Sequence, residues 1–109
     1  MSVSAAAHGT QTAVVNTEHV LATITDAGVY VLVVDTANMV NADILELRIN
    51  TKAMHDGTSR LAYMASYAHI QGEPNKYSIP VPVDTEIIAT LKQTAGTARD
   101  FPWNLLKVG

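Results

Sequence analysis

The stretch Leu45–Asn50 has the sequence Leu-Glu-Leu-Arg-Ile-Asn, in which aliphatic and polar residues alternate. Successive side chains of an extended chain point to opposite faces, so this period of two puts three aliphatic side chains on one face and the polar side chains on the other. The alternation predicts a strand with one face buried and one face in solvent.

The same period of two recurs on both sides of this stretch. Residues Arg60–Tyr67 alternate in the same manner, whereas Val29–Val34 is apolar on both faces and rich in β-branched residues, which is typical of a strand covered on both sides. Further strands are predicted over residues 13–15, 18–24, 77–83, 86–94 and 101–108, which brings the total to eight. A helix over Ser59–Ile70 is the main competing prediction, because its Ala and Met content tolerates a helix.

Turn-forming residues separate the predicted strands at a spacing of roughly ten residues. Glycine and asparagine in these segments supply the positive φ that tight turns often require. In Tyr77–Val83, Pro80 and Pro82 lie two residues apart, so both missing N–H groups point the same way and the segment can only be an edge strand. Short strands at this spacing predict an all-β fold, an antiparallel β-sandwich of jelly-roll type.

The length of 109 residues predicts one domain. Residues 1–12 contain almost no side chain large enough to anchor them, so we expect a flexible N-terminal arm over 1–12 and a single β-sandwich domain over 13–109.

Composition argues against several classes of function. Seven Lys and Arg against ten Asp and Glu, without any run of like charge, disfavour direct nucleic-acid binding. The longest apolar run, Ala27–Val34, is far shorter than the roughly 20 residues of a membrane-spanning helix, so we expect no membrane association. Only 16% of the residues are charged, against about 25% in typical domains, which predicts a largely neutral surface. Such a surface is either buried against partners or solvated by Thr, Asn, Ser and Gln, and composition favours neither.

No catalytic residue, cofactor site or metal site is predicted. The four histidines are scattered without the close pairing that a metal site requires, and cysteine is absent. Asp84 and Glu86 lie two apart, but charges beside an edge strand typically block edge-to-edge pairing. Trp103 shares one face of its predicted strand with Phe101 and Leu105, which favours a place in the core over a sugar-stacking surface.

Two stretches, Ala27–Ile49 and Leu91–Val108, resemble small virion proteins of tailed bacteriophages. The length and the eight predicted strands are similar to the jelly-roll capsid cement proteins, also called decoration or staple proteins, of short-tailed phages. The resemblance implies a non-enzymatic structural protein that binds the outside of the phage head and ties major capsid subunits together. It also implies a homodimer at two-fold positions, located on the outer surface of the virion after assembly in the host cytoplasm.

We expect the partner interface to use the arm and the polar loops. The candidate residues are His8, Thr10, Gln11, Asn38, Asn41, His55 and Asn75. Two other functions remain open: an accessory protein of the tail, neck or fibre, and a carbohydrate-binding module that uses Trp103 with Tyr63 and Tyr67.

Overall fold

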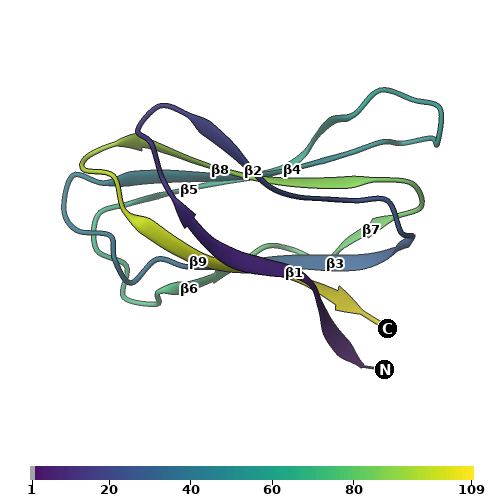
Figure 1. Cartoon of the computed structure of the whole chain (residues 1–109), viewed down its shortest axis with the longest axis horizontal. Helices are drawn as coiled ribbons and strands as arrows, with labels where there is room; N and C mark the ends of the chain where they lie inside the picture. Colours follow the sequence, from purple (N-terminus) through teal and green to yellow (C-terminus); the bar gives the residue numbers. More distant parts are fainter. Residues whose placement is uncertain (1) are drawn as a thin grey trace.

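The computed structural model of the chain describes residues 2–109, which form nine strands in two antiparallel sheets that face each other (Figure 1). Sheet A has the order β1-β9-β3-β6, and β7 also pairs with β3; its strands are β1 (Val3–Thr12), β3 (Gly28–Asp35), β6 (Asn75–Tyr77), β7 (Val81–Val83) and β9 (Asp100–Val108). Sheet B has the order β2-β8-β4-β5, with β2 (Glu18–Ile24), β4 (Ile44–Thr51), β5 (Arg60–Ala68) and β8 (Ile87–Ala95). The predicted all-β fold is confirmed. Within residues 2–109 there is no helix of the length and hydropathy needed to cross a bilayer.

The space between the sheets is filled by inward-facing side chains of the central strands. In β4, Leu45, Leu47 and Ile49 are at most 1% exposed, as the alternation predicts. The other large, fully buried core residues are Tyr30, Leu32 and Val34 of β3, Ile87 and Leu91 of β8, and Phe101 and Leu105 of β9. Burial of apolar surface stabilises the fold by about 25 cal/mol per Å², and it contributes more than any other interaction to holding the two sheets together.

The segment that also tolerated a helix is strand β5. It pairs antiparallel with β4 in a register that places Tyr63 opposite Ile49 and Tyr67 opposite Leu45. Both tyrosines therefore lie on the core side of sheet B, while Met64 lies on the outer side. The prediction of a strand is confirmed, and the helix over Ser59–Ile70 is excluded.

The proline-containing segment lies at the edge of sheet A, as predicted, but it forms two short strands instead of one. Both β6 and β7 pair with β3. Between them, the Ser78 backbone N–H donates to the Leu32 carbonyl at 2.8 Å, and the Leu32 N–H donates to the Ser78 hydroxyl oxygen at 2.9 Å. The hydroxyl oxygen of Ser78 thus accepts the Leu32 N–H where the regular pairing is interrupted between β6 and β7.

The N-terminal segment is strand β1, which corrects the expectation of a flexible arm; residue 1 lies outside the described residues. The strand pairs with β9 along its length, from Val3 opposite Val108 to Thr12 opposite Asp100. A bulge interrupts the pairing between Ala5 and Ala7. The small side chains of β1 add little to the core, so backbone hydrogen bonds to β9 are the main attachment.

Side-chain and backbone contacts fix the two ends of β1. The Thr12 hydroxyl donates to the Asp100 carboxylate at 2.8 Å, and the Gly109 N–H donates to the Ser2 carbonyl at 2.7 Å. In the middle of the strand, Gly9 lies opposite Trp103, and a Cβ atom at Gly9 would lie 3.5 Å from the indole nitrogen. The indole ring of Trp103 therefore lies directly against β1.

The predicted strand over residues 13–15 does not form. This segment carries the chain from sheet A to sheet B: the Ala13 N–H donates to the Arg99 carbonyl at 2.9 Å, and the Asn16 N–H donates to the Gln93 carbonyl at 2.7 Å. Asn16 has a φ of 66°, in the left-handed region that asparagine tolerates. A turn between the layers is incompatible with strand pairing at these residues.

An ion pair between the buried Asp43 and the partly exposed Arg99 joins the loops at one end of the sandwich, which we call the loop end. Asp43 is 1% exposed; its carboxylate accepts from Arg99 Nε at 2.8 Å and from the backbone N–H groups of Val40 and Thr97 at 3.0 and 3.1 Å. Burial by itself raises the pKa of Asp43, but these hydrogen bonds together outweigh it and hold the pKa below its ordinary value. A Cβ atom at Gly96, whose φ is 92°, would overlap this carboxylate, so only glycine fits there.

Candidate functional site

The outer face of sheet A is apolar over the half of its length that lies away from the loop end. By register, Val29 and Val31 of β3 lie beside Val108 and Leu106 of β9, and all four side chains are partly exposed. Two exposed residues flank them, Pro82 of β7 opposite Val29 and Val3 of β1 opposite Val108. We call these six residues the apolar face. Neither sheet covers it, because sheet B packs on the opposite side of sheet A (Figure 1).

Charged groups on this side of sheet A are confined to the loop end. Among the outward positions of the paired strands, only Asp35 and Asp100 carry a charge, and Asp100 already accepts the hydroxyl of Thr12. A face with aliphatic side chains in its centre and no Lys or Arg is poorly hydrated. It is the kind of surface that a partner of complementary shape buries.

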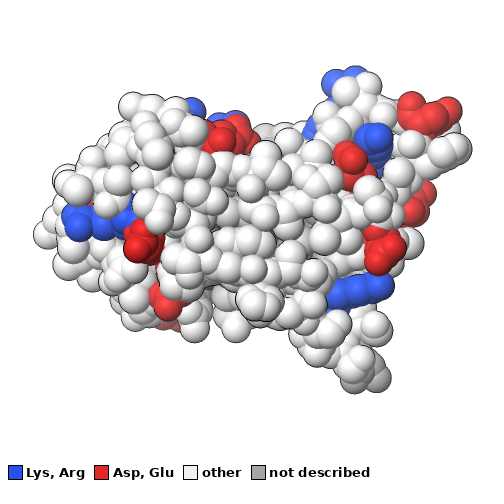
Figure 2. Space-filling model, viewed as in Figure 1, with Lys and Arg blue, Asp and Glu red and all other residues white. Residues whose placement is uncertain are grey.

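The outer face of sheet B is different, because charged side chains lie across its centre. Arg48 of β4 lies 2.9 Å from Glu46 and 3.6 Å from Glu18 of β2, and the Thr90 hydroxyl donates to Glu18 at 2.7 Å. In Figure 2 charged side chains gather at the two ends of the molecule and along its upper border, on the side of sheet B, while the middle of the visible side, over β1, is uncharged. The centre of the outer side of sheet B is thus charged, although Val20 and Met64 beside it are 60% and 52% exposed.

A shallow groove of about 250 Å³ lies on the outer side of sheet A at the loop end. Tyr77 of β6, 60% exposed, lines it together with the side chains of Asn75, Asn104 and Asp35. The Oδ1 atom of Asn104 is buried and has no hydrogen-bond partner among the described residues. The groove therefore combines an aromatic ring with amide and carboxylate groups.

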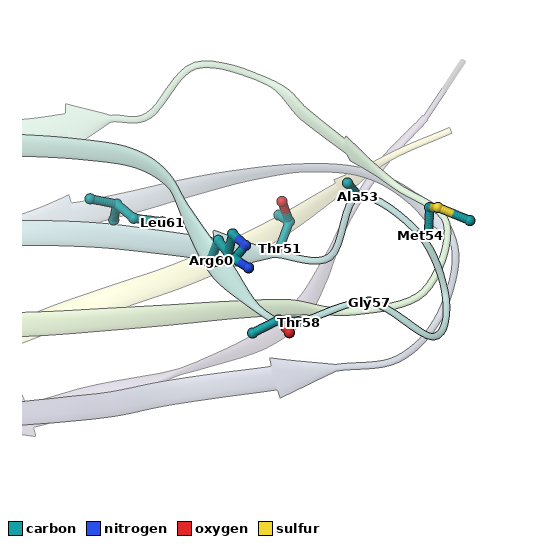
Figure 3. A pocket seen from close by; sticks show the side chains of 7 residues that line it. All are labelled: Thr51, Ala53, Met54, Gly57, Thr58, Arg60 and Leu61. Atoms are coloured by element: carbon teal, nitrogen blue, oxygen red, sulfur yellow. The ribbon is translucent and has the colours of Figure 1, made fainter.

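A second hollow, of about 390 Å³, lies beside the hairpin that joins β4 to β5 (Figure 3). It is lined by strand residues such as Thr51 and Leu61 and by Met54 and Gly57 of the connecting loop. Met54 and Leu61 are 64% and 54% exposed, and of the lining residues only Arg60 is ionisable. A single guanidinium among small and apolar groups offers contact area and no partner for proton transfer.

The seven residues predicted to meet a partner do not form one patch. His8 and Thr10 lie on the outer side of β1, and Gln11 lies between Thr10 and Thr12 on the opposite side of the strand. Asn75 is on β6, at the other edge of sheet A. The remaining three, Asn38, Asn41 and His55, lie in loops, and His55 is in the β4–β5 connection at the opposite end from Asn38.

One of these residues has a structural task. The side-chain amide of Asn38 donates to the carbonyl of Asp100 at 2.8 Å, so it ties its loop to the start of β9. The apolar face and Tyr77 were not predicted from the sequence as contact residues. The apolar face could have been predicted from Val29–Val34, because the outward positions of this segment are as aliphatic as the inward ones.

The histidines and carboxylates are dispersed in the part of the chain that the structure describes. Residues 2–109 contain no group of three or more His, Cys, Asp and Glu side chains that could hold a metal ion. Two histidines accept backbone hydrogen bonds: His19 Nε2 from Val14 at 3.0 Å and His69 Nδ1 from Ala42 at 2.9 Å. These two imidazoles stabilise turns.

The aromatic residues proposed for sugar stacking face inward. Trp103, Tyr63 and Tyr67 all pack against the core, as predicted for Trp103, and they come from different sheets. Burial, together with the neighbouring Tyr63, raises the pKa of Tyr67. A stacking platform built from these three rings is not formed.

Comparisons with family models, with curated proteins and with solved structures give no match to this chain.

Proposed function

We propose that this protein is a non-enzymatic structural protein of a phage particle, a capsid cement protein of jelly-roll topology that docks on the head through the apolar face. The observation that carries the proposal is the apolar face itself, in which outward aliphatic residues of β3 and β9 are left uncovered by either sheet.

The strand order supports jelly-roll topology. If β6 and β7 count as one interrupted edge strand, the chain has eight strands, and β9 inserts between β1 and β3 as β8 inserts between β2 and β4. Such nesting of late strands between early ones is what two Greek keys produce in a jelly roll, an architecture used by viral capsid and lectin domains.

The size of the docking surface suits a protein that binds a repetitive shell. Four strands about 4.8 Å apart and eight residues long give sheet A an outer face of roughly 500 Å², and the apolar face covers roughly half of it. Stable interfaces bury about 800 Å² on each partner, so one copy would bind modestly. On a shell, many equivalent sites make modest affinity sufficient when copies are linked.

The proposed partner is the major capsid protein, and the proposed location is the outside of the virion. Both come from the resemblance of Ala27–Ile49 and Leu91–Val108 to phage virion proteins. The dimer at two-fold positions has the same source. The low charge of the chain and the uncharged centre of sheet A fit a protein that is buried against other subunits.

The docking proposal is tested by placing a charge on the apolar face. We expect Val31→Lys to weaken co-sedimentation with heads of the phage that encodes the chain by at least about tenfold, because a buried unpaired charge costs more than the roughly 1.4 kcal/mol that this factor represents. The matched control is Met64→Lys on the outer side of sheet B, which we expect to bind normally. Equal binding by both variants and the unchanged protein would refute docking through sheet A.

Copy number separates the head from other positions in the virion. Quantitative mass spectrometry of purified virions should find hundreds of copies per particle for a cement protein. A handful of copies would instead support an accessory protein of the tail, neck or fibre.

The groove beside Tyr77 favours carbohydrate binding as a second candidate function. An exposed aromatic ring can stack on a pyranose, and the neighbouring amides of Asn75 and Asn104 can bond its hydroxyls. Glycan-array binding that disappears in Tyr77→Ala and persists in Tyr63→Phe would support it. Absence of any glycan binding by the unchanged protein would remove it.

A further inference from the structure

We propose that β1 pairs antiparallel with β1 of a second copy of this chain across a two-fold axis, so that the two copies of sheet A become one continuous sheet. The pairing gives the dimer of the proposed function a specific interface, but it does not depend on binding to a phage head.

Three of the four sheet edges carry features that oppose pairing. The β6/β7 edge is interrupted at Ser78–Pro80 and carries Pro82 and Lys76. The β2 edge begins with Glu18, which is tied to Arg48, and it has a bulge between Val20 and Ala22. Interruption, proline, charge and bulges are the usual means by which natural sheets block edge-to-edge contact.

The β5 edge is protected more weakly. It begins with Arg60, its pairing with β4 is bulged between Leu61 and Tyr63, and Lys76 Nζ lies 5.1 Å from the ring centroid of Tyr67. Two cations therefore lie along this side of the sandwich, where they would face the cations of an identical copy.

The β1 edge has no such charge. Val3–Thr12 contains no Lys, Arg, Asp or Glu and no proline, and all of its residues except Ala7 and Gln11 are exposed. In Figure 1 it lies at the front of the view, and no other strand passes in front of it. Its one irregularity is the bulge between Ala5 and Ala7, which leaves Ala7–Thr12 as a regular stretch.

A second copy is the partner that this edge fits best. A two-fold axis puts each residue opposite another residue of the same strand, so a charged strand would meet its own charge. In Ala7–Thr12 every pairing joins small or neutral polar side chains. When His8 is uncharged, self-pairing therefore brings no like charges together. The pairing also places two apolar faces side by side, which doubles the apolar area to roughly 500 Å².

The test uses the absence of cysteine from the chain. A single cysteine introduced at each position of Ala7–Thr12 in turn can form a disulfide only with another copy. Facing residues of antiparallel strands have Cα atoms about 4.5–5.5 Å apart, within the range that a disulfide spans. We expect the one position that faces its own copy to cross-link under mild oxidation, which locates the axis, while Ser66→Cys on β5 stays monomeric.

A lysine at the cross-linking position provides the second measurement. It faces its own copy, so we expect the dissociation constant of the dimer, measured by sedimentation equilibrium, to rise about tenfold at low salt. Most of the loss should be recovered near 1 M salt, where the screening length is about 3 Å. Circular dichroism and thermal unfolding of each variant verify that it is folded.

Three outcomes overturn the pairing. One is a mass of 11.7 kDa, that of a single chain, at every concentration, without a disulfide at any β1 position. The second is equal cross-linking of Ser66→Cys, which indicates random collision. The third is a dimer whose stability the β1 lysine does not change. A monomeric protein that still binds heads through Val31 would refute the pairing and leave the docking proposal intact.

Discussion

The outer faces of the two sheets differ in the side chains at their centres. Each sheet must present one side to its surroundings, and sheet B does so with an ion-pair network of Glu18, Arg48 and Glu46. Sheet A presents Val29, Val31 and their neighbours on β9 in the corresponding place.

The contrast shows that the fold does not require aliphatic side chains on the outside of a sheet. The core is already complete between the sheets, with Leu45, Leu47 and their neighbours almost fully buried. The aliphatic side chains on the outer face of sheet A are therefore not needed to complete this core, which is consistent with the docking role proposed for them.

The largest expected difference in the free energy of unfolding is between variants of two adjacent leucines of β9. Leu105 is fully buried between the sheets, whereas Leu106 lies on the apolar face. We expect Leu105→Ala to lower the free energy of unfolding of the isolated protein by about 2–5 kcal/mol and Leu106→Ala by about 1 kcal/mol or less. Urea denaturation of both variants measures the difference. Equal losses would mean that the outer side of sheet A is covered in the isolated protein.

An intermediate effect is expected at the Asp43–Arg99 ion pair of the loop end. Asp43→Asn removes the charge that Arg99 and two backbone N–H groups stabilise, and we expect a loss of about 2–3 kcal/mol at pH 7. Because the pKa of Asp43 is lowered in the folded protein, its contribution is complete above the ordinary value of about 3.9 and is lost as the pH falls through the lowered value. Denaturation at pH 7 and pH 3 should show less acid sensitivity in Asp43→Asn. If the free energy of unfolding fell equally from pH 7 to pH 3 in Asp43→Asn and the unchanged protein, Asp43 would not be a source of the acid sensitivity.

The smallest effect is expected on the outer face of sheet B. Arg48 and its two glutamate partners are partly exposed, so we expect Arg48→Met to change the free energy of unfolding by less than about 1 kcal/mol. High salt should reduce the difference in the free energy of unfolding between Arg48→Met and the unchanged protein. A loss as large as that of Asp43→Asn would show that the network stabilises the fold and does more than solvate this face.

Local sequence pattern was enough to predict the central strands. The alternation in Leu45–Asn50 fixes both the strand type and the buried face of β4, and Pro80 and Pro82 place their segment at an edge. The pattern did not predict β1, because Val3–Thr12 is held by pairing with residues about 100 positions away, and its apolar side chains are Val3 and three alanines. Tertiary pairing of this kind leaves no local signal.

The candidate surface was only partly predictable, for a related reason. The sequence correctly marked Val29–Val34 as apolar on both faces, and the inference that both faces are covered holds for the inner one alone within this chain. Polar loop residues such as Asn38 are predicted contacts, yet the side-chain amide of Asn38 donates to the Asp100 carbonyl within the chain. A sequence shows which side chains avoid water, and the register decides which of them lie outward.

The position of the only tryptophan gives this protein an internal optical probe. The indole of Trp103 lies against Gly9 on one side and the core on the other, so its fluorescence responds to the detachment of β1 as well as to complete unfolding. Stopped-flow traces would separate the two events if the strand peels away first. Fraying at the N-terminal edge could then be followed in the unlabelled protein.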